Sequence, residues 1–345
     1  MFLKNTWYVA AWDHEVPYRK LVHRKILGEN VVLYRKRDGS VCALEDSCPH
    51  RKLPLSMGTL VGDDVQCGYH GLKFDCSGAC VEVPAYKDIP KQARVRAFPI
   101  VERWNWIWIW MGDPALADEA LIIDIPEYDN PEWGINRGPA MDIACNYQHM
   151  TDNLVDPSHV SFVHKTSLGD AETVDTPVKT EVEGDSVIVS RWLMDCNLAP
   201  FFQPRVKFEG RADRLQRYEL RLPSMAVIGD IIAPAGSGAP EGNLHPDVFL
   251  LDSYNFITPV DETHCRYYWF QVRNFDADSK EASDALTADF IEAFNEDIVV
   301  LEAVQKGMDN ATTAPINLPI DAGSFQCKKI IKRMIAQEQA MQAAE

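Results

Sequence analysis

Two short segments in the N-terminal third of the chain each place a cysteine shortly before a histidine. Cys48 and His50 belong to CPH, Cys67 and His70 belong to CGYH, and sixteen residues separate the two segments. Thiolate and imidazole groups bind zinc, and they also bind iron–sulfur clusters. Classical zinc fingers keep cysteine with cysteine and histidine with histidine along the chain. Here each segment supplies one of each, so two thiolates can bind one iron and two imidazoles a second iron. The spacing predicts a two-iron cluster, with a Cys2His2 zinc site as the alternative.

A second group of residues that could bind a metal lies in the segment DNLVDPSHVSFVH. It contains Asn153, Asp156, His159 and His164. Two histidines and one carboxylate on one face of an iron ion leave open positions for O2. His159 and His164 are five residues apart, which is ~140° on a regular helix. They can share one ion only if the helix widens or ends between them, and a purely structural histidine pair is the alternative.

The carboxylate for such a site is expected from elsewhere in the chain. The segment EAFNEDIVVLEAV contains Glu296, Asp297 and Glu302 on an otherwise apolar helix. In the helical projection Asp297 falls on the same face as Phe294 and Leu301. A carboxylate on an apolar face is costly unless it is paired or bound to a metal. Asp297 is therefore the predicted third ligand, and Glu296 remains open as the alternative.

The elements that must position these residues differ between the two parts of the chain. Residues 1–112 are predicted to form many short strands, because VVLYRKRDGSVCALE has the pattern of a hairpin with Asp38-Gly39 at its turn. An acidic, proline-rich linker follows. Beyond it, DSVIVSRWLM and HCRYYWFQVRNF favour strands, whereas residues 279–307 and the C-terminal segment favour helices. We expect an all-β domain over 1–112 and an α+β domain over 113–345.

The composition argues against several broad classes of protein. Of the 345 residues, with a net charge of −17, residues 1–112 hold 16 Lys and Arg against 12 Asp and Glu, without a long basic run. We therefore expect no nucleic-acid partner. No apolar stretch approaches the ~18 residues of a membrane span, so no membrane association is expected.

Nine cysteines, with no signal segment, favour a reducing cytoplasm over a disulfide framework. Cys42, Cys76 and Cys80 lie outside the metal pattern and are expected to be small packing residues.

The chain resembles the oxygenase components of Rieske non-heme iron oxygenases from end to end. The resemblance is carried by KNTWYVAAW, CPHR, CGYHGLKFD, VERWNWIWIWMGDP, DNLVDPSHVSFVH, RNFD, IDAG and the C-terminal IAQEQA. The most similar groups are vanillate O-demethylase oxygenases, with the dicamba O-demethylase and toluenesulfonate methyl-monooxygenase subunits as relatives. The resemblance implies a Rieske domain followed by a helix-grip (START-like) catalytic domain. It also implies a homotrimer, a [2Fe–2S] cluster, a mononuclear Fe(II), and electrons from NAD(P)H supplied by a flavin or ferredoxin reductase.

The same resemblance assigns roles to individual residues. Asp156 matches the acid that links a cluster histidine, here His70, to an iron histidine of the neighbouring subunit, and Asn153 lies beside it in the motif. Dicamba-type enzymes bind the substrate acid through an amide and an imidazole. Those positions fall by eye at Ile228 and Asn255, which are the expected pocket residues. Because Ile228 departs from the pattern, dicamba itself is not the expected substrate.

The expected reaction is O-demethylation of a methoxylated aromatic acid, similar to vanillate, to a phenol and formaldehyde with O2. One alternative is hydroxylation of an aryl methyl group, as in the toluenesulfonate relatives, or N-demethylation. An alternative of a different class is a Rieske electron carrier. Such a carrier would need neither His159 and His164 nor a second domain.

Overall fold

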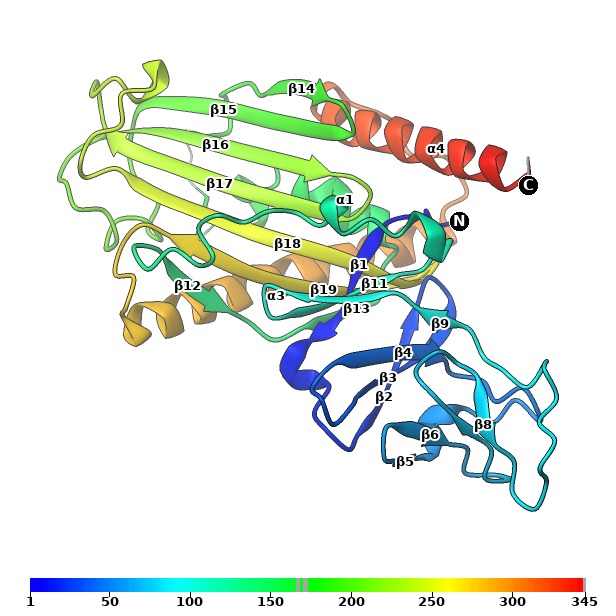
Figure 1. The fold of residues 1–345 in the computed structure, drawn as a ribbon. Coiled ribbons are helices and arrows are strands. Elements are labelled where there is room, and N and C mark those ends of the chain that lie inside the picture. The colour runs from blue at the N-terminus through cyan, green and yellow to red at the C-terminus, as the bar shows by residue number, and fades with distance from the viewer. Residues whose placement is uncertain (166–167, 170–172, 344–345) are drawn as a thin grey trace. The chain divides into compact units, whose positions relative to one another are not determined.

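The computed structural model describes residues 1–165, 168–169 and 173–343 (Figure 1). The chain divides into two compact units. The first comprises Met1–Ile123 and Thr258–Glu262, and the second comprises Asp124–Ile257 and Thr263–Glu345. Among the described residues, no helix is long and apolar enough to cross a membrane.

The first unit is built from antiparallel strands, as its short apolar runs and tight turns predict. Over the residues described, its strands pair in the orders β1-β11-β10, β2-β3-β4-β9 and β5-β6-β7-β8. The bounds are β1 (Trp7–Trp12), β2 (Leu21–Ile26), β3 (Glu29–Arg35), β4 (Val41–Glu45), β5 (Thr59–Val61), β6 (Asp64–Gln66), β7 (Lys73–Phe74), β8 (Cys80–Glu82), β9 (Ala97–Phe98), β10 (Ile100–Arg103) and β11 (Trp106–Trp110). The alternating Trp and Ile of β11 are all buried, so this strand is core.

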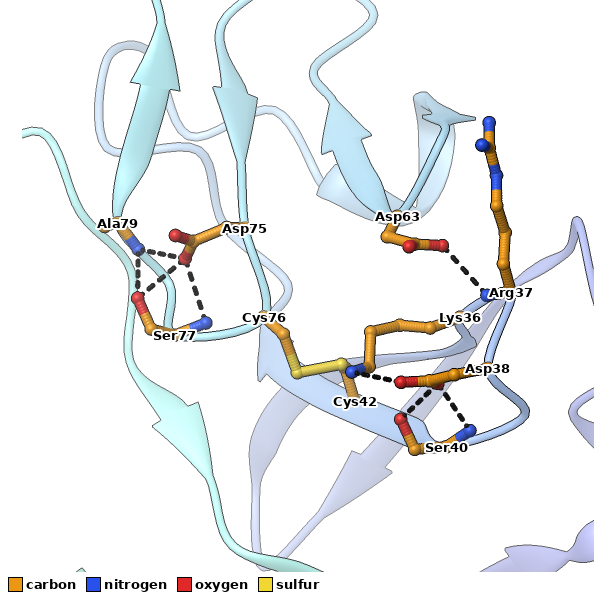
Figure 2. Close-up of a disulfide and its surroundings, with 10 residues drawn as sticks. All are labelled: Lys36, Arg37, Asp38, Ser40, Cys42, Asp63, Asp75, Cys76, Ser77 and Ala79. Carbon is orange, nitrogen blue, oxygen red and sulfur yellow. Dashed lines mark hydrogen bonds and ion pairs between the residues drawn. A yellow bond between two sulfur atoms is a disulfide. The ribbon is translucent and has the colours of Figure 1, made fainter.

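Cys42 and Cys76 form a disulfide, which corrects the expectation that both are ordinary packing residues (Figure 2). Cys42 lies in β4 and Cys76 follows β7. The two are 34 positions apart in sequence, and their Cα atoms are 5.6 Å apart. The turn that carries Cys76 is ordered by Asp75, whose Oδ1 accepts hydrogen bonds from the backbone N–H of Ser77 and Ala79. The seven other cysteines, including Cys80, are buried and form no disulfide.

The second unit is an antiparallel sheet with helices packed on it. In the part of the unit that is described, the sheet order is β12-β19-β18-β17-β16-β15-β14, and β13 also pairs with β19. The strand bounds are β12 (Gly134–Arg137), β13 (Met141–Ile143), β14 (Lys179–Glu183), β15 (Ser186–Cys196), β16 (Ala212–Arg221), β17 (Met225–Pro234), β18 (Phe249–Asp261) and β19 (His264–Arg273). The helices are α1 (Tyr147–Leu154), α2 (Val160–Val163), α3 (Lys280–Asn310) and α4 (Ala322–Gln342).

Helix α3 begins at a serine cap and buries one continuous stripe. The Ser279 hydroxyl accepts a hydrogen bond from the Ala282 N–H, which satisfies one of the unpaired amides of the first turn. The buried residues recur with helical spacing: Leu286, Phe290, Ala293, Phe294, Asp297, Leu301 and Gln305. In Figure 1 the long helix runs along the sheet near β12 and β19, the helix-grip arrangement that the resemblance implies. The stripe brings Asp297 into the interior as the helical projection predicts.

The disulfide predicts a specific thiol count and a loss of stability on reduction. Alkylation of the acid-unfolded, iron-free chain should label seven thiols without reductant and all nine after reduction. Cys76→Ser should lower the stability of the first unit by about 2–4 kcal/mol, because the unfolded chain regains the freedom of a closed loop. A phosphine reductant should destabilise the wild type and leave Cys76→Ser unchanged. Labelling of nine thiols before reduction would contradict the disulfide.

Candidate metal centres

A break between two helices places the histidines of the second unit. Helix α1 ends at Leu154, and Pro157 follows soon after. The residue before a proline is disfavoured in helical geometry, so the helix cannot run through. His159 then stands immediately before the one-turn helix α2, and His164 immediately after it, where the backbone has left helical geometry. The required helix end is therefore present, and the two rings lie with their centroids 5.4 Å apart.

Three candidate metal ligands meet in the interior of this unit. One ligand atom each from His159, His164 and Asp297 lies within 4.8 Å of the other two. The Oδ1 of Asp297 is 3.5 Å from Nε2 of His159 and 3.3 Å from Nε2 of His164. His164 and Asp297 are only 3% and 4% exposed. Two imidazoles and one carboxylate converging in a buried site are the donor set of a non-heme Fe(II) centre, so these residues fit that metal.

The groups behind the three side chains fix their orientation. The amide of Asn153 donates to Asp297 Oδ1 at 3.1 Å. Nδ1 of His159 contacts the backbone carbonyl of Asp156, and Nδ1 of His164 contacts Glu296 Oε2 at 2.7 Å. A proton on Nδ1 leaves Nε2 with its lone pair directed to the metal position. The sequence predicted Asp297 as the third ligand and left Glu296 as the alternative. In the structure Asp297 faces both histidines, and Glu296 contacts Nδ1 of His164.

The electrostatic environment differs for the two histidines. Burial lowers the pKa of His159, although the neighbouring Asp297 acts in the opposite direction. Burial also acts to lower the pKa of His164, but the carboxylates of Asp297 and Glu296 outweigh it and leave this pKa raised. Sequence reasoning missed Glu296 as the partner of His164. The available signal was its position, one residue from a predicted ligand on the same helix.

The carboxylate of Asp156 has a local role within the chain. Its Oδ1 accepts a hydrogen bond from the Ser158 N–H at 2.8 Å. The atom that contacts His159 is the backbone carbonyl of Asp156, whereas the resemblance suggested the side chain. A hollow beside Asp156 is also lined by His149 and Asp152. Asp156 thus lies beside the metal site and contacts the predicted ligand His159 through its backbone carbonyl.

A mainly apolar cavity adjoins the three ligands. The described residues that line it are Asn153, Leu154, His159, Val160, His164, Leu168, Phe201, Arg214, Tyr218, Ile228, Asp230, Leu251, Ser253, Phe290, Ala293, Phe294 and Asp297. Ile228, one of the two expected pocket residues, is among them. Asn255 is not, and its amide is engaged with Ser253, Ala226 and the Tyr267 hydroxyl. The cavity lies next to the metal position, and most of the side chains that line it are apolar.

The cysteine and histidine segments of the first unit come together in space. Cys48 and Cys67 are both buried, and burial together with the neighbouring Cys67 thiol raises the pKa of Cys48. His50 and His70 are exposed, and their ring centroids are 4.5 Å apart. Gly71 has a φ of +76°, and a Cβ there would lie 2.9 Å from Pro84, so the second segment needs glycine at this point. Two buried thiols beside two exposed imidazoles fit a two-iron cluster with one iron on each pair.

The chain matches two family descriptions that agree with these two centres. Residues 6–99 match the Rieske [2Fe-2S] domain, and residues 143–337 match the vanillate O-demethylase oxygenase C-terminal domain. The fold and the two metal centres define a terminal oxygenase that carries a [2Fe–2S] cluster and a mononuclear iron. The chain belongs to the Rieske non-heme iron oxygenases, in the group with the vanillate O-demethylase type of C-terminal domain.

Individual relatives match over nearly the whole chain. The iron–sulfur subunit of the toluene-4-sulfonate monooxygenase system of Comamonas testosteroni is 38% identical over 342 residues, covering 98% of both chains. A vanillate O-demethylase oxygenase subunit of a Pseudomonas species is 37% identical, covering 98% of this chain and 96% of the relative. The crystal structure of dicamba monooxygenase bound to 3,6-dichlorosalicylic acid superposes with a TM-score of 0.89 at 31% identity, over 100% and 99% of the two chains.

These matches confirm the fold class, the class of enzyme and the two iron cofactors that the sequence predicts. They also place the chain among oxygenase components of multicomponent systems, which depend on O2 and on a reductase. The Rieske electron carrier, the alternative of a different class, is thereby wrong, because the match includes a complete oxygenase domain.

The contact between Glu296 and His164 predicts an effect on metal affinity. Glu296→Gln keeps the size of the side chain but removes the charge that holds the imidazole. We expect Fe(II) affinity at the mononuclear site to fall about 10- to 100-fold, with the cluster spectrum unchanged. Competition with a Fe(II) chelator measures this. Glu292→Gln, an exposed position one turn earlier on α3, is the matched control. Equal affinities in the two variants would contradict the role of Glu296.

Proposed function

We propose that the protein O-demethylates a methoxylated aromatic acid, giving a phenol and formaldehyde. The observation that carries this proposal is the apolar cavity beside the three converging ligands, in a domain of the vanillate O-demethylase type. Two kinds of relative are named as O-demethylases. They are the vanillate O-demethylase subunits and a dicamba O-demethylase that is 34% identical. Hydroxylation of the methyl carbon consumes O2, two electrons and two protons. It gives water and a hemiacetal, which collapses to phenol and formaldehyde.

In this proposal the residues have defined tasks. Cys48, His50, Cys67 and His70 hold the [2Fe–2S] cluster, and His159, His164 and Asp297 hold the mononuclear iron. When bound, these groups supply single electrons and O2 activation next to the substrate. Asn153 and Glu296 keep two of the iron ligands in orientation, and the aromatic side chains of the cavity exclude water and hold the ring. Residues 1–112 form the cluster domain and residues 113–345 the catalytic domain, in a cytoplasmic enzyme.

A second candidate reaction is hydroxylation of an aryl methyl group. This reaction is favoured by the 38% sequence identity to the iron–sulfur subunit of the toluene-4-sulfonate monooxygenase system. N-demethylation is a related outcome at the same cavity. All three reactions insert oxygen at a methyl carbon, so their products distinguish them.

The proposed reaction predicts the products of turnover. With a reductase, NAD(P)H and methoxybenzoates, we expect one formaldehyde and one phenol for each O2 consumed. Methylbenzenesulfonates would instead give a benzylic alcohol without formaldehyde, and N-methyl substrates would give formaldehyde and an amine. His159→Ala should keep the cluster spectrum and lose all turnover. Metal analysis should find about three iron atoms per chain. If none of the methoxybenzoates tested released formaldehyde, the O-demethylase proposal would be refuted.

We also propose a homotrimer in which Asp156 connects two subunits. The support is a hollow that contains Asp156 and is rimmed by exposed apolar side chains, such as Ile316 and Phe325, which are 81% and 58% exposed. Apolar surface of this kind is typical of an interface. The carboxylate of Asp156 would accept a hydrogen bond from His70 of a neighbouring subunit, while its backbone carbonyl orients His159.

The bridging role predicts a kinetic defect without loss of metal. Asp156→Asn should keep near-normal iron content and a reducible cluster, because Asp156 ligates neither metal. Cluster reoxidation by O2 with substrate bound should slow by orders of magnitude. Asp152→Asn is the matched control, since Asp152 lines the same hollow and pairs with Lys328 at 2.6 Å. A solvated surface charge would change stability by less than about 0.5 kcal/mol and leave the kinetics unaffected.

Mixed assemblies test whether the electron crosses a subunit boundary. Chains that lack His70 and chains that lack Asp156 should partly restore activity when they are assembled together. Failure of every mixture to exceed the parent variants would contradict the inter-subunit path.

A further inference from the structure

Arg191 of β15 is a buried cation that donates hydrogen bonds to three separate segments of the second unit. The residue is only 6% exposed. Its Nε donates to Gln216 Oε1 at 2.7 Å, and its Nη1 donates to the backbone carbonyls of Thr173 and Thr176 at 2.6 and 3.1 Å. Its Nη2 donates to the Pro157 carbonyl at 3.3 Å. Because a guanidinium presents its N–H donors in one fixed plane, it holds these acceptors in a defined arrangement.

The carbonyl acceptors lie on both sides of the short helix that has the two histidine ligands at its ends. Pro157 lies two positions before His159. Thr173 and Thr176 lie farther along the chain than His164. Helix α2 has only four residues, and a helix of one turn gains little stability from its own hydrogen bonds. The placement of both imidazoles therefore depends on what holds the chain before and after α2.

Thr173 connects the arginine to α2. Its backbone carbonyl accepts the shortest of the four hydrogen bonds from Arg191, and its hydroxyl forms a hydrogen bond with the Ser161 hydroxyl. Ser161 lies within α2, between His159 and His164. Thr173 is only 1% exposed, so this connection is buried. One residue thus separates the guanidinium from the helix, and a shift of the guanidinium is passed on to α2.

The sheet fixes the other side of the guanidinium. Strands β15 and β16 are antiparallel neighbours, and Arg191 is directly opposite Gln216 in their register. Side chains of directly opposite residues lie on the same face of a sheet, which lets Gln216 accept from Nε. Gln216 is 0% exposed, so its amide is held within the core. The arginine therefore links a pair of sheet strands to the chain on both sides of α2.

We propose that Arg191 is a positioning residue of the mononuclear iron site, which holds the chain on both sides of α2 so that His159 and His164 face one ion. Arg191 is not among the described residues that line the cavity, so it acts through the backbone and not on a substrate. The geometry of its donors, rather than its charge alone, performs this task. The inference rests on the iron site of the proposed function, but not on which methyl group is oxidised.

Fe(II) binding tests the proposal without turnover. Arg191→Gln removes the guanidinium from the full chain, and the [2Fe–2S] cluster spectrum should stay unchanged. We expect Fe(II) affinity at the mononuclear site to fall about 10- to 100-fold, as for the loss of a group that orients metal ligands. Competition with a Fe(II) chelator measures the affinity. The electron paramagnetic resonance signal of nitric oxide bound at saturating Fe(II) should also broaden, since the imidazoles no longer adopt one arrangement.

Arg273→Gln is the matched control. Arg273 of β19 is 0% exposed, and its Nη2 donates to the backbone carbonyls of Asp276 and Ser279 at 3.0 and 3.3 Å. It is therefore also a buried arginine that binds main-chain carbonyls, but these precede α3 and lie about five turns or more before Asp297. Both variants should lower the unfolding temperature, whereas only Arg191→Gln should change the Fe(II) affinity and the nitric oxide signal.

Two milder variants decide the question if Arg191→Gln does not fold. Arg191→Lys keeps the charge, but an ammonium cannot span acceptors from three segments, so Fe(II) affinity should stay at least about threefold below the wild type. Ser161→Ala removes the hydroxyl contact between α2 and Thr173, and it should also weaken Fe(II) binding by at least about threefold.

Three results would overturn the proposal. The first is an Arg191→Gln protein whose Fe(II) affinity equals that of the wild type or that of Arg273→Gln, as a purely structural role predicts. The second is wild-type affinity in Arg191→Lys, which would assign the effect to the charge. The third is wild-type affinity in Ser161→Ala, which would contradict the connection through Thr173. The second and third need no folded Arg191→Gln protein.

The proposed function fails by different results. A wild type that binds no Fe(II) at this site would refute both the iron site and the role of Arg191. A wild type that binds Fe(II) but releases no formaldehyde from methoxybenzoates would refute O-demethylation and leave this inference standing. Formaldehyde release with equal Fe(II) affinity in Arg191→Gln and the wild type would do the reverse.

Discussion

A buried carboxylate facing two imidazoles is the constraint on which the second unit depends. Asp297 lies in the apolar stripe of α3, and its Oδ1 faces Nε2 of both His159 and His164. Because Nδ1 of each ring contacts an oxygen acceptor, the three facing atoms are all electron-pair donors. Three electron-pair donors that face one another are unfavourable in a buried site unless a cation lies between them. Burial acts to lower the pKa of His164, but the carboxylates of Asp297 and Glu296 outweigh it and leave this pKa raised.

The backbone around these ligands follows from the same constraint. A continuous helix through both histidines would place them on different faces. Here His159 directly precedes the one-turn helix α2, and the chain leaves helical geometry at His164. Gly169 lies close to α2, and its N–H donates to the His164 carbonyl. A Cβ at Gly169 would lie 2.7 Å from the Val160 carbonyl oxygen, so only glycine permits this approach. Local sequence and long-range packing thus specify the same geometry, as expected of a site that must be preorganised.

The sequence predicted those features that depend on local spacing or on one helical face. The two cysteine–histidine segments and the burial of Asp297 are of this kind, whereas the break between α1 and α2 was not predicted. The Cys42–Cys76 disulfide was missed, because its cysteines are 34 positions apart in sequence and strand pairing brings them together. Asn255 was expected in the pocket but lies outside the lining, since strand register decides which side chains reach it. Arg214 gave no signal, because an arginine in a strand is most often a surface residue.

The first unit divides its ligands between interior and surface, and this division has consequences for electron exchange. Cys48 and Cys67 are buried in the same core cluster as the disulfide partner Cys42, so the thiolate side faces the interior. His50 and His70 are exposed, so another protein can reach the cluster through an imidazole edge. Neutral imidazoles also raise the reduction potential above that of an all-thiolate cluster. A cluster held by these four residues would therefore be accessible to a partner protein through His50 and His70. The buried Cys48 and Cys67 would anchor it to the core.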